Sequence, residues 1–64
     1  GELEARKLID KAKGILMKAK GISENEAYAI LRKTAMDQNK RISEVAETLI
    51  LASDMMGDNY NGGT

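Results

Sequence analysis

The chain has 64 residues, ten of them basic and ten acidic, and it contains no His, Cys, Pro, Phe or Trp. This length allows one small domain, and the missing Cys and His exclude disulfides and Cys/His zinc sites. The formal charge of zero hides two fields of opposite sign, because every Lys and Arg lies between Arg6 and Arg41 and only acidic charges follow. A concentrated basic region is typical of proteins that bind polyanions, although lysines that merely solvate a helix face give the same count.

No apolar run approaches the roughly 18 residues of a membrane span, and no leader of the secretory type is recognisable. Together with the lack of Cys, this favours a cytoplasmic protein without a membrane partner.

The first predicted helix runs from Leu3 to Lys20. Its apolar residues alternate in steps of three and four, the a/d rhythm of a coiled-coil seam, at Ala5, Leu8, Ala12, Ile15 and Ala19. Ile9 and Leu16 widen this stripe enough to cover a globular core as well. We expect dimerisation, where it occurs, through Ala5, Leu8 and Ala12. Gly21 is expected to end the helix in the left-handed conformation.

Gly14 lies inside this helix, where a glycine costs about 1 kcal/mol relative to alanine. Such a glycine often allows another backbone to approach closely. Two interpretations stay open here, a crossing with the second or third helix and room for a nucleic-acid backbone. Lys13 and Lys20 share a helix face with Arg6, because the triplet at positions 12–14 recurs at 19–21.

A second helix is predicted for residues 24–38. Ser23 and Glu26 form a capping-box pattern, in which each side chain bonds the backbone amide of the other residue. One face of this helix holds Ala27, Ile30, Leu31, Thr34 and Ala35, and nearly the opposite side holds Ala29 and Met36. A helix apolar around so much of its surface is expected to be central and to contact both neighbours. Residues 39–41 form a polar turn.

Ser43 is the predicted cap of a third helix that runs to about Met56. Its inward stripe is expected to hold Ile42, Val45, Ala46, Leu49, Ile50 and Ser53. Leu51 and Met55 project elsewhere and offer a competing interface for association. Residues 57–64 are predicted to be a flexible glycine-rich tail. The predicted fold is therefore all-α, a compact three-helix bundle over residues 3–56 whose first helix extends into a coiled-coil seam.

The residue types argue against catalysis and cofactor binding. Without His and Cys the usual nucleophile–base pairs are missing, and no glycine pattern matches a nucleotide-binding loop. Residues 58–62 match a calcium loop only superficially, because Tyr60 occupies a ligand position. We expect no enzyme activity, no metal and no cofactor.

The charge pattern also restricts how nucleic acid can bind. Base stacking on an aromatic sheet is excluded, because Tyr28 and Tyr60 are the only aromatic residues. DNA reading by a helix-turn-helix is opposed by the third helix, which would carry only acidic charges into the major groove. Nucleic acid, if it binds, is expected on the first two helices and the turn at residues 39–41.

Several runs of residues resemble the ANTAR domain. The run from Arg6 to Met17 resembles the opening of that family, and the pattern continues in order with Ser23-Glu24, Ala27-Tyr28, Leu31-Arg32, Ala35-Met36-Asp37 and Ile42-Ser43-Glu44-Val45-Ala46. The resemblance covers roughly Leu3 to Met56. It implies a three-helix RNA-binding domain of a bacterial antitermination regulator, which binds tandem small hairpins in a leader RNA so that polymerase reads through.

The resemblance also implies an RNA surface and further partners. Carried over by position, the RNA surface maps to Lys13, Gly14, Lys20, Arg32, Lys33, Lys40 and Arg41. The family usually follows a receiver or sensor domain on a coiled-coil helix, which implies a homodimer of the full-length protein. The alternative function is a helical protein-interaction module whose basic face meets an acidic partner.

Overall fold

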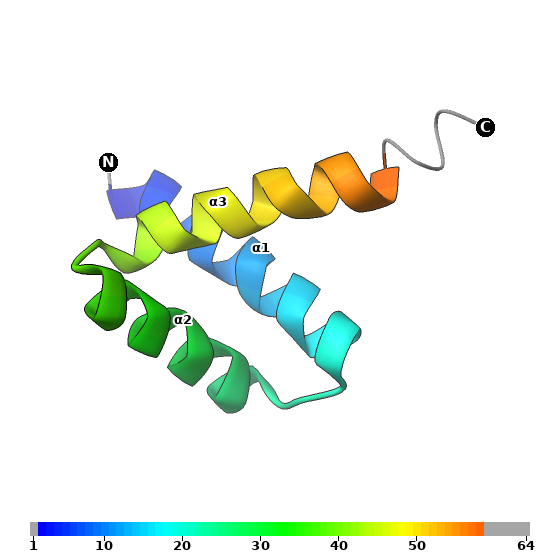
Figure 1. Cartoon of the computed structure of the whole chain (residues 1–64), viewed down its shortest axis with the longest axis horizontal. Helices are drawn as coiled ribbons and strands as arrows, with labels where there is room; N and C mark the ends of the chain where they lie inside the picture. The colour runs from blue at the N-terminus through cyan, green and yellow to red at the C-terminus, as the bar shows by residue number, and fades with distance from the viewer. Residues whose placement is uncertain (1, 59–64) are drawn as a thin grey trace.

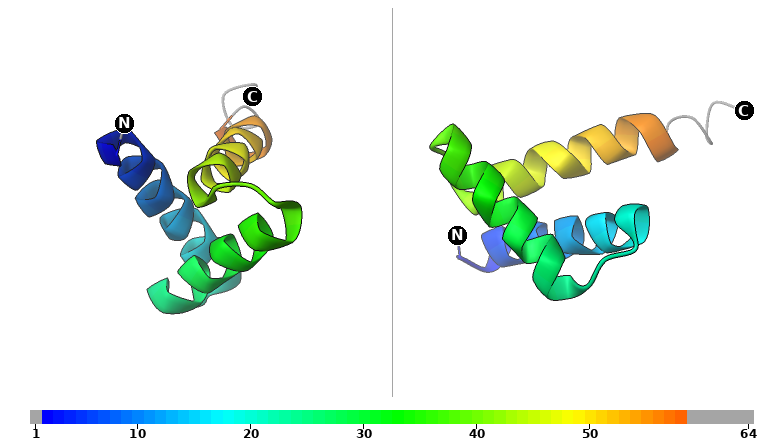
Figure 2. Two further views of the ribbon diagram at one scale, coloured as in Figure 1. Left: turned by 90° about the vertical axis from the view of Figure 1, so that its left-hand side faces the viewer. Right: turned by 60° about the horizontal axis from the view of Figure 1, so that its bottom comes forward.

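The first and third of three α-helices start near one another and diverge along their lengths, and the second packs across both (Figure 1, Figure 2). The computed structural model describes residues 2–58, with α1 (Glu2–Lys20), α2 (Glu24–Gln38), α3 (Ile42–Ser53) and a π-helical turn, η1 (Asp54–Asp58). The interface between α1 and α3 is the most extensive of the helix contacts. The expected all-α three-helix bundle is confirmed.

The junction between α1 and α2 forms as the sequence predicts. Gly21 has a φ of +65°, and its amide donates to the carbonyl of Met17 at 2.9 Å, which closes α1. The Ser23 amide donates to the Glu26 carboxylate at 3.1 Å, and the Glu26 amide donates to the Ser23 hydroxyl at 3.2 Å. This reciprocal capping box fixes the residue at which α2 begins.

The turn between α2 and α3 depends on Asn39. This residue adopts the left-handed conformation at a φ of 59°, and the amide of Lys40 donates to the carbonyl of Ala35 at 2.8 Å. Asparagine tolerates this conformation better than most residues, and the long bond back into the helix is that of a Schellman motif.

The predicted cap of the third helix is wrong by two residues. Arg41, and not Ser43, is the N-cap of α3, and its amide donates to the Glu44 carboxylate at 2.9 Å. Serine is the better capping residue by type. However, after the tight turn at Asn39 the backbone is extended at Arg41 and helical from Ile42 onward, so Ser43 already lies inside the helix. A guanidinium has no acceptor atom, so this cap consists of the Glu44 bond alone.

Small residues form the centre of the core. One alanine from each helix has no exposed surface, and these are Ala12, Ala27 and Ala46. Leu31 is the largest side chain that is fully buried, with 1% exposure. Half-buried side chains surround this cluster, namely Leu8, Ile9, Ile15, Ile22, Ile30, Val45 and Leu49. Because alanine lets helix axes approach closely, the three helices meet at short range around Leu31.

The expected position of the second helix is only partly right. The buried face of α2 contacts both neighbours, as predicted. Its second apolar side does not, because Met36 is 68% exposed and Ala29 is exposed beside it. α1 and α3 pack against each other, so they cover only one face of α2. The opposite side of α2 faces solvent.

The end of the chain is described only as far as residue 58. Gly57 and Asp58 belong to η1, and residues 59–64 lie outside the described residues. The flexible tail therefore stays a prediction.

Leu31→Ala should destabilise the domain by about 2–5 kcal/mol, the usual range for removing a buried leucine side chain. Small domains have little stability to lose, so this variant should unfold near room temperature. Leu51→Ala is the matched control, because Leu51 is 57% exposed on α3. Thermal melts followed by circular dichroism measure both; equal melting temperatures for the two variants would contradict the position assigned to the core.

Candidate functional site

The basic residues gather on α1, α2 and the turn between α2 and α3, while α3 itself carries no Lys or Arg. Every Lys and Arg side chain is exposed except that of Lys13. The charge segregation seen in the sequence therefore becomes a spatial separation, with a basic surface on two helices and an acidic third helix.

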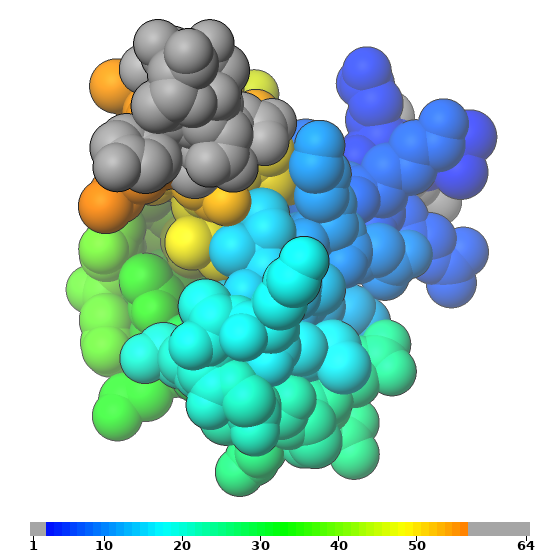
Figure 3. Space-filling model, turned by 90° about the vertical axis from the view of Figure 1, so that its right-hand side faces the viewer, coloured from blue at the N-terminus to red at the C-terminus, as the bar shows by residue number. Residues whose placement is uncertain are grey.

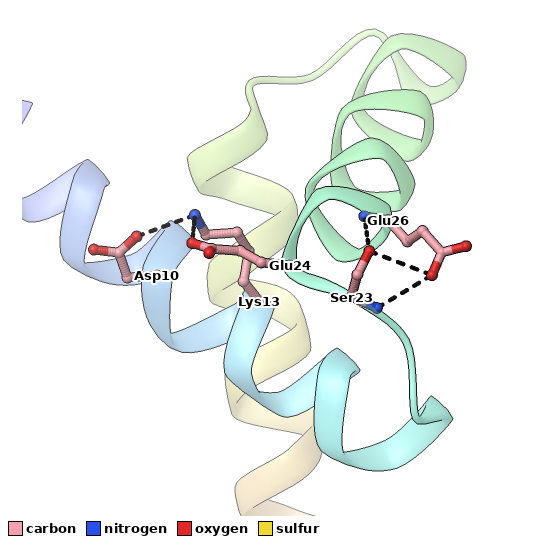
Figure 4. A network of polar contacts seen from close by, with 5 residues as sticks. All are labelled: Asp10, Lys13, Ser23, Glu24 and Glu26. Carbon is pink, nitrogen blue, oxygen red and sulfur yellow. Dashed lines mark hydrogen bonds and ion pairs between the residues drawn. The ribbon is translucent and has the colours of Figure 1, made fainter.

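Lys13 is partly buried and takes part in an ion-pair network with exposed carboxylates at the junction of α1 and α2 (Figure 4). Its Nζ lies 2.9 Å from a carboxylate oxygen of Glu24 at the start of α2, and 3.4 Å from a carboxylate oxygen of Asp10 on α1. The same Nζ lies 5.8 Å from the centre of the Tyr28 ring, within the range of a cation–π contact. With a side chain only 16% exposed, Lys13 links the two helices.

The network changes the protonation of Lys13. The hydrogen bond to Glu24 raises the pKa of Lys13 above its ordinary value of 10.5, against a lowering by partial burial, and the charges of Glu24 and Asp10 add to the rise. The ammonium ion is thus satisfied by two carboxylates of its own chain. Lys13, which the sequence placed first among the RNA contacts, is in this structure an internal contact between α1 and α2.

A mixed apolar and basic hollow lies on the outer side of α2. It is open to solvent, encloses about 500 Å³, and is lined by Tyr28, Ala29, Arg32, Lys33 and Met36. We call it the α2 hollow. Arg32 and Lys33 were predicted from the sequence, whereas Tyr28 and Met36 were not assigned to the RNA surface. Their spacing from Arg32, four residues on either side, is the signal that places all three on one helix face.

The other predicted residues lie apart from the α2 hollow. Lys20 is exposed at the end of α1. Lys40 and Arg41 are exposed at the opposite end of α2, where Lys40 also lines a second hollow between α2 and α3. A 15-residue helix separates these two ends by about 22 Å. The structure therefore does not gather the seven predicted RNA residues into one site.

Gly14 lies on the outer side of α1. A Cβ built at this position has no neighbouring atom within 4 Å, and the backbone is not in the left-handed conformation. A crossing with another helix, one of the two interpretations left open by the sequence, does not occur at Gly14. The other interpretation, room for a backbone from outside the domain, stays open.

The three residues predicted to form the dimer interface differ in how far they are buried within their own chain. Ala12 is fully buried in the core of its own chain, so its side chain offers no surface to a partner in this conformation. Leu8 is half-buried against the same core, and Ala5 is half-exposed. Leu3 is 67% exposed at the start of α1, where it lines an open hollow with Ala5, Arg6 and Ile9.

Within residues 2–58 no cluster of acidic side chains is arranged to hold a metal ion. No helix in this part of the chain is long and apolar enough to cross a membrane.

Comparisons with known proteins point to one family. The model of the ANTAR domain matches residues 1–50. Over 48 residues the chain is 52% identical to the nitrate regulatory protein of Klebsiella oxytoca and, over the same length, 38% identical to the transcriptional regulatory protein PdtaR of Mycobacterium tuberculosis. These segments cover 75% of this chain but 12% and 23% of the two relatives, respectively. No solved structure matches the chain significantly.

Lys13→Met should lower the melting temperature by a few degrees at neutral pH, because two carboxylates lose their shared cation. The folded-state pKa of Lys13 is raised, so its stabilisation is fully present below the unfolded-state value of 10.5 and is lost as the pH rises through the folded-state value. The melting temperatures of wild type and Lys13→Met should therefore converge in strongly alkaline buffer.

Lys18→Met is the control for this experiment, since Lys18 is exposed on the same helix and contacts no carboxylate of the described chain. Its melting temperature at neutral pH should stay close to that of the wild type. A gap between wild type and Lys13→Met that does not change with pH would contradict the role given to the ion-pair network.

Proposed function

Because the chain belongs to the ANTAR domain family, we propose that it is the RNA-binding output domain of a bacterial transcription antitermination regulator. The names of its relatives, a nitrate regulatory protein and a transcriptional regulatory protein, support a regulatory role. In this proposal the domain binds tandem small hairpins of a leader RNA and stabilises the antiterminator, so that polymerase reads through. It acts without enzyme activity, in the cytoplasm where transcription takes place.

The α2 hollow is the observation that carries this proposal. Its Arg32 and Lys33 are exposed cations, and within the described chain neither is paired with a carboxylate. They stand beside the exposed ring of Tyr28 and the exposed thioether of Met36. A polyanion with unpaired bases matches this mixture, because its phosphates need cations and its bases need flat or apolar surfaces.

The chemistry of the α2 hollow suits a splayed-out base better than a duplex. Arg32 can present the plane of its guanidinium to a base, and Tyr28 and Met36 supply apolar contact. Lys13 contacts the Tyr28 ring from the α1 side, so the ion-pair network helps to hold this ring in place. RNA loops expose such bases, whereas the bases of paired stems are stacked on one another.

A protein-interaction module is the alternative, and the exposed Tyr28 and Met36 also fit it, since aromatic residues and Met are common in protein interfaces. The two functions separate in a binding titration. An RNA ligand should require unpaired loop bases, whereas an acidic protein that binds the same cations should not.

The matched segment spans 12% and 23% of the two relatives, and in this proposal the whole regulator is likewise larger than this chain. We place a receiver or sensor domain, joined through a coiled coil, among its further parts, in agreement with the family resemblance. In such a protein the state of the sensor would control how two output domains are presented to two hairpins.

Arg32→Ala should weaken binding to an RNA of two stem–loops by about 1–3 kcal/mol, the range for the loss of one stacking contact to a base. Arg32→Lys keeps the positive charge but loses the flat guanidinium group that can stack on a base. We therefore expect Arg32→Lys to lose discrimination between intact and altered loop sequences without a change in salt dependence. Fluorescence titrations at about 50 and 200 mM salt, against paired and single stem–loops, measure both properties.

Glu47→Lys on α3 is the charge control and should tighten binding only modestly, through the general field of the domain. The proposal would be wrong if Arg32 and Lys33 could both be replaced without effect while Glu47→Lys abolished binding. The RNA surface would then lie on the acidic side of the molecule.

Dimerisation is expected through the start of α1, which projects beyond the rest of the folded body (Figure 3). Ala5 is the seam residue that remains accessible there, and the exposed Leu3 lines the same hollow. Leu3→Glu should shift the chain toward monomer in sedimentation experiments at high concentration. Met55→Glu, on the competing apolar patch at η1, should leave association unchanged; the opposite result would move the interface to that patch.

A further inference from the structure

A row of lysines on the outer side of α1 lies outside the α2 hollow. Lys7, Lys11 and Lys18 are exposed, and none forms an ion pair or a side-chain hydrogen bond with a residue that the structure describes. Together with Gly14 they are separated by four, three and four residues, so all four positions lie on one face of α1. At 1.5 Å per residue this row, which we call the α1 stripe, is about 16 Å long.

No contact with the residues that the structure describes explains the glycine at position 14. Glycine weakens a helix interior, and this one neither adopts a positive φ nor makes room for another helix. A side chain here would point into open space between Lys11 and Lys18. The absence of a side chain therefore creates a gap in the surface of α1, in the middle of three unpaired cations.

The acidic residues near the α1 stripe define its edges. Asp10 lies toward α2, and its carboxylate is engaged with Lys13. On the side toward α3, Glu4 and Glu47 share an open hollow with Lys7 and Lys11. A polyanion on α1 is therefore repelled from the α3 side and favoured along the line through Gly14.

We propose that the sugar–phosphate backbone of the bound RNA lies along the α1 stripe and passes closely over Gly14, with its phosphates on Lys7, Lys11 and Lys18. This inference rests on the proposed RNA-binding function and gives the domain two subsites. The α1 stripe binds the backbone without reading sequence, and the α2 hollow binds an unpaired base. The Lys13 network lies between them, since Lys13 is adjacent to Gly14 in the chain and contacts Tyr28 of the α2 hollow.

The role of Gly14 in this arrangement is steric. Backbone amides inside a helix are already bonded, so Gly14 offers no free N–H donor to a phosphate. It offers its Cα hydrogens and the space of a missing methyl group, which let a ribose or a phosphate oxygen touch the helix surface. A larger residue would hold the RNA away from the helix and lengthen the contacts of the flanking lysines.

Substitutions at Gly14 separate stability from binding. Gly14→Ala should raise the melting temperature by roughly 4–8 °C, because alanine is the better helix former and meets no neighbour. The same variant should weaken binding to a synthetic RNA of two stem–loops about tenfold, which corresponds to about 1.4 kcal/mol. Gly14→Leu should weaken binding further and remain folded.

Lysine substitutions test the phosphate contacts independently. Each single substitution should make the slope of log affinity against log salt concentration shallower by about 0.7–0.9, the value for one phosphate. The three variants are Lys7→Gln, Lys11→Gln and Lys18→Gln. Arg6→Gln removes the same charge from a different side of α1 and should leave the slope unchanged. Lys13→Met should also leave it unchanged, because its charge is neutralised within the domain.

Three results would overturn the α1 stripe while leaving the RNA function intact. The first is wild-type binding that persists undiminished in Gly14→Ala and Gly14→Leu. The second is a salt slope that responds equally to Arg6→Gln and to the lysines of the stripe. A loss of stability in Gly14→Ala would show that the glycine has an internal role and would also reject the inference. A wild-type domain that binds no stem–loop RNA at all would reject the proposed function itself.

Discussion

Close approach of the three helices at small residues is the constraint on which the rest of this structure depends. Ala12, Ala27 and Ala46 lose all exposed surface where the helices meet, and Leu31 is the largest side chain buried among them. A core built this way needs few large apolar residues, but it requires that each helix present an alanine at the contact. It also fixes the faces that remain for other uses, because every residue opposite these alanines is directed to solvent.

The positions of the charges follow from this packing. α3 contributes its apolar stripe to the core and keeps its acidic residues outside, while α1 and α2 carry the cations on their outer sides. The contact between α1 and the start of α2 also brings Glu24 to Lys13, and so one cation is used to join the helices. The charge that a polyanion meets therefore depends on the helix it approaches. The outer sides of α1 and α2 are positive, and acidic residues border this surface on the α3 side.

Stability and binding make opposite demands at two places on this surface. Gly14 leaves a gap in a helix that alanine would strengthen, and Met36 leaves an apolar side chain in water. Neither feature improves folding, and both lie beside exposed cations. Residues that break a local rule without a gain inside the fold are expected at functional sites, where the compensating contact comes from a ligand. The α1 stripe and the α2 hollow each combine such a residue with exposed cations, which is why we propose both as contacts for RNA.

The sequence by itself determined the three helices, the capping box at Ser23, the glycine end at Gly21 and the inward stripe of α3, because these depend on neighbours within a few residues. It also carried the family resemblance, which is a property of ordered motifs. Only the tertiary structure decided the use of residues whose partners lie on another helix. Lys13 forms an ion pair with Glu24 of the neighbouring helix, and Ala12 lies in the core. The outer side of α2 faces solvent and forms a hollow. Periodicity shows that a helix has an apolar face, but which helix covers that face is decided by long-range packing.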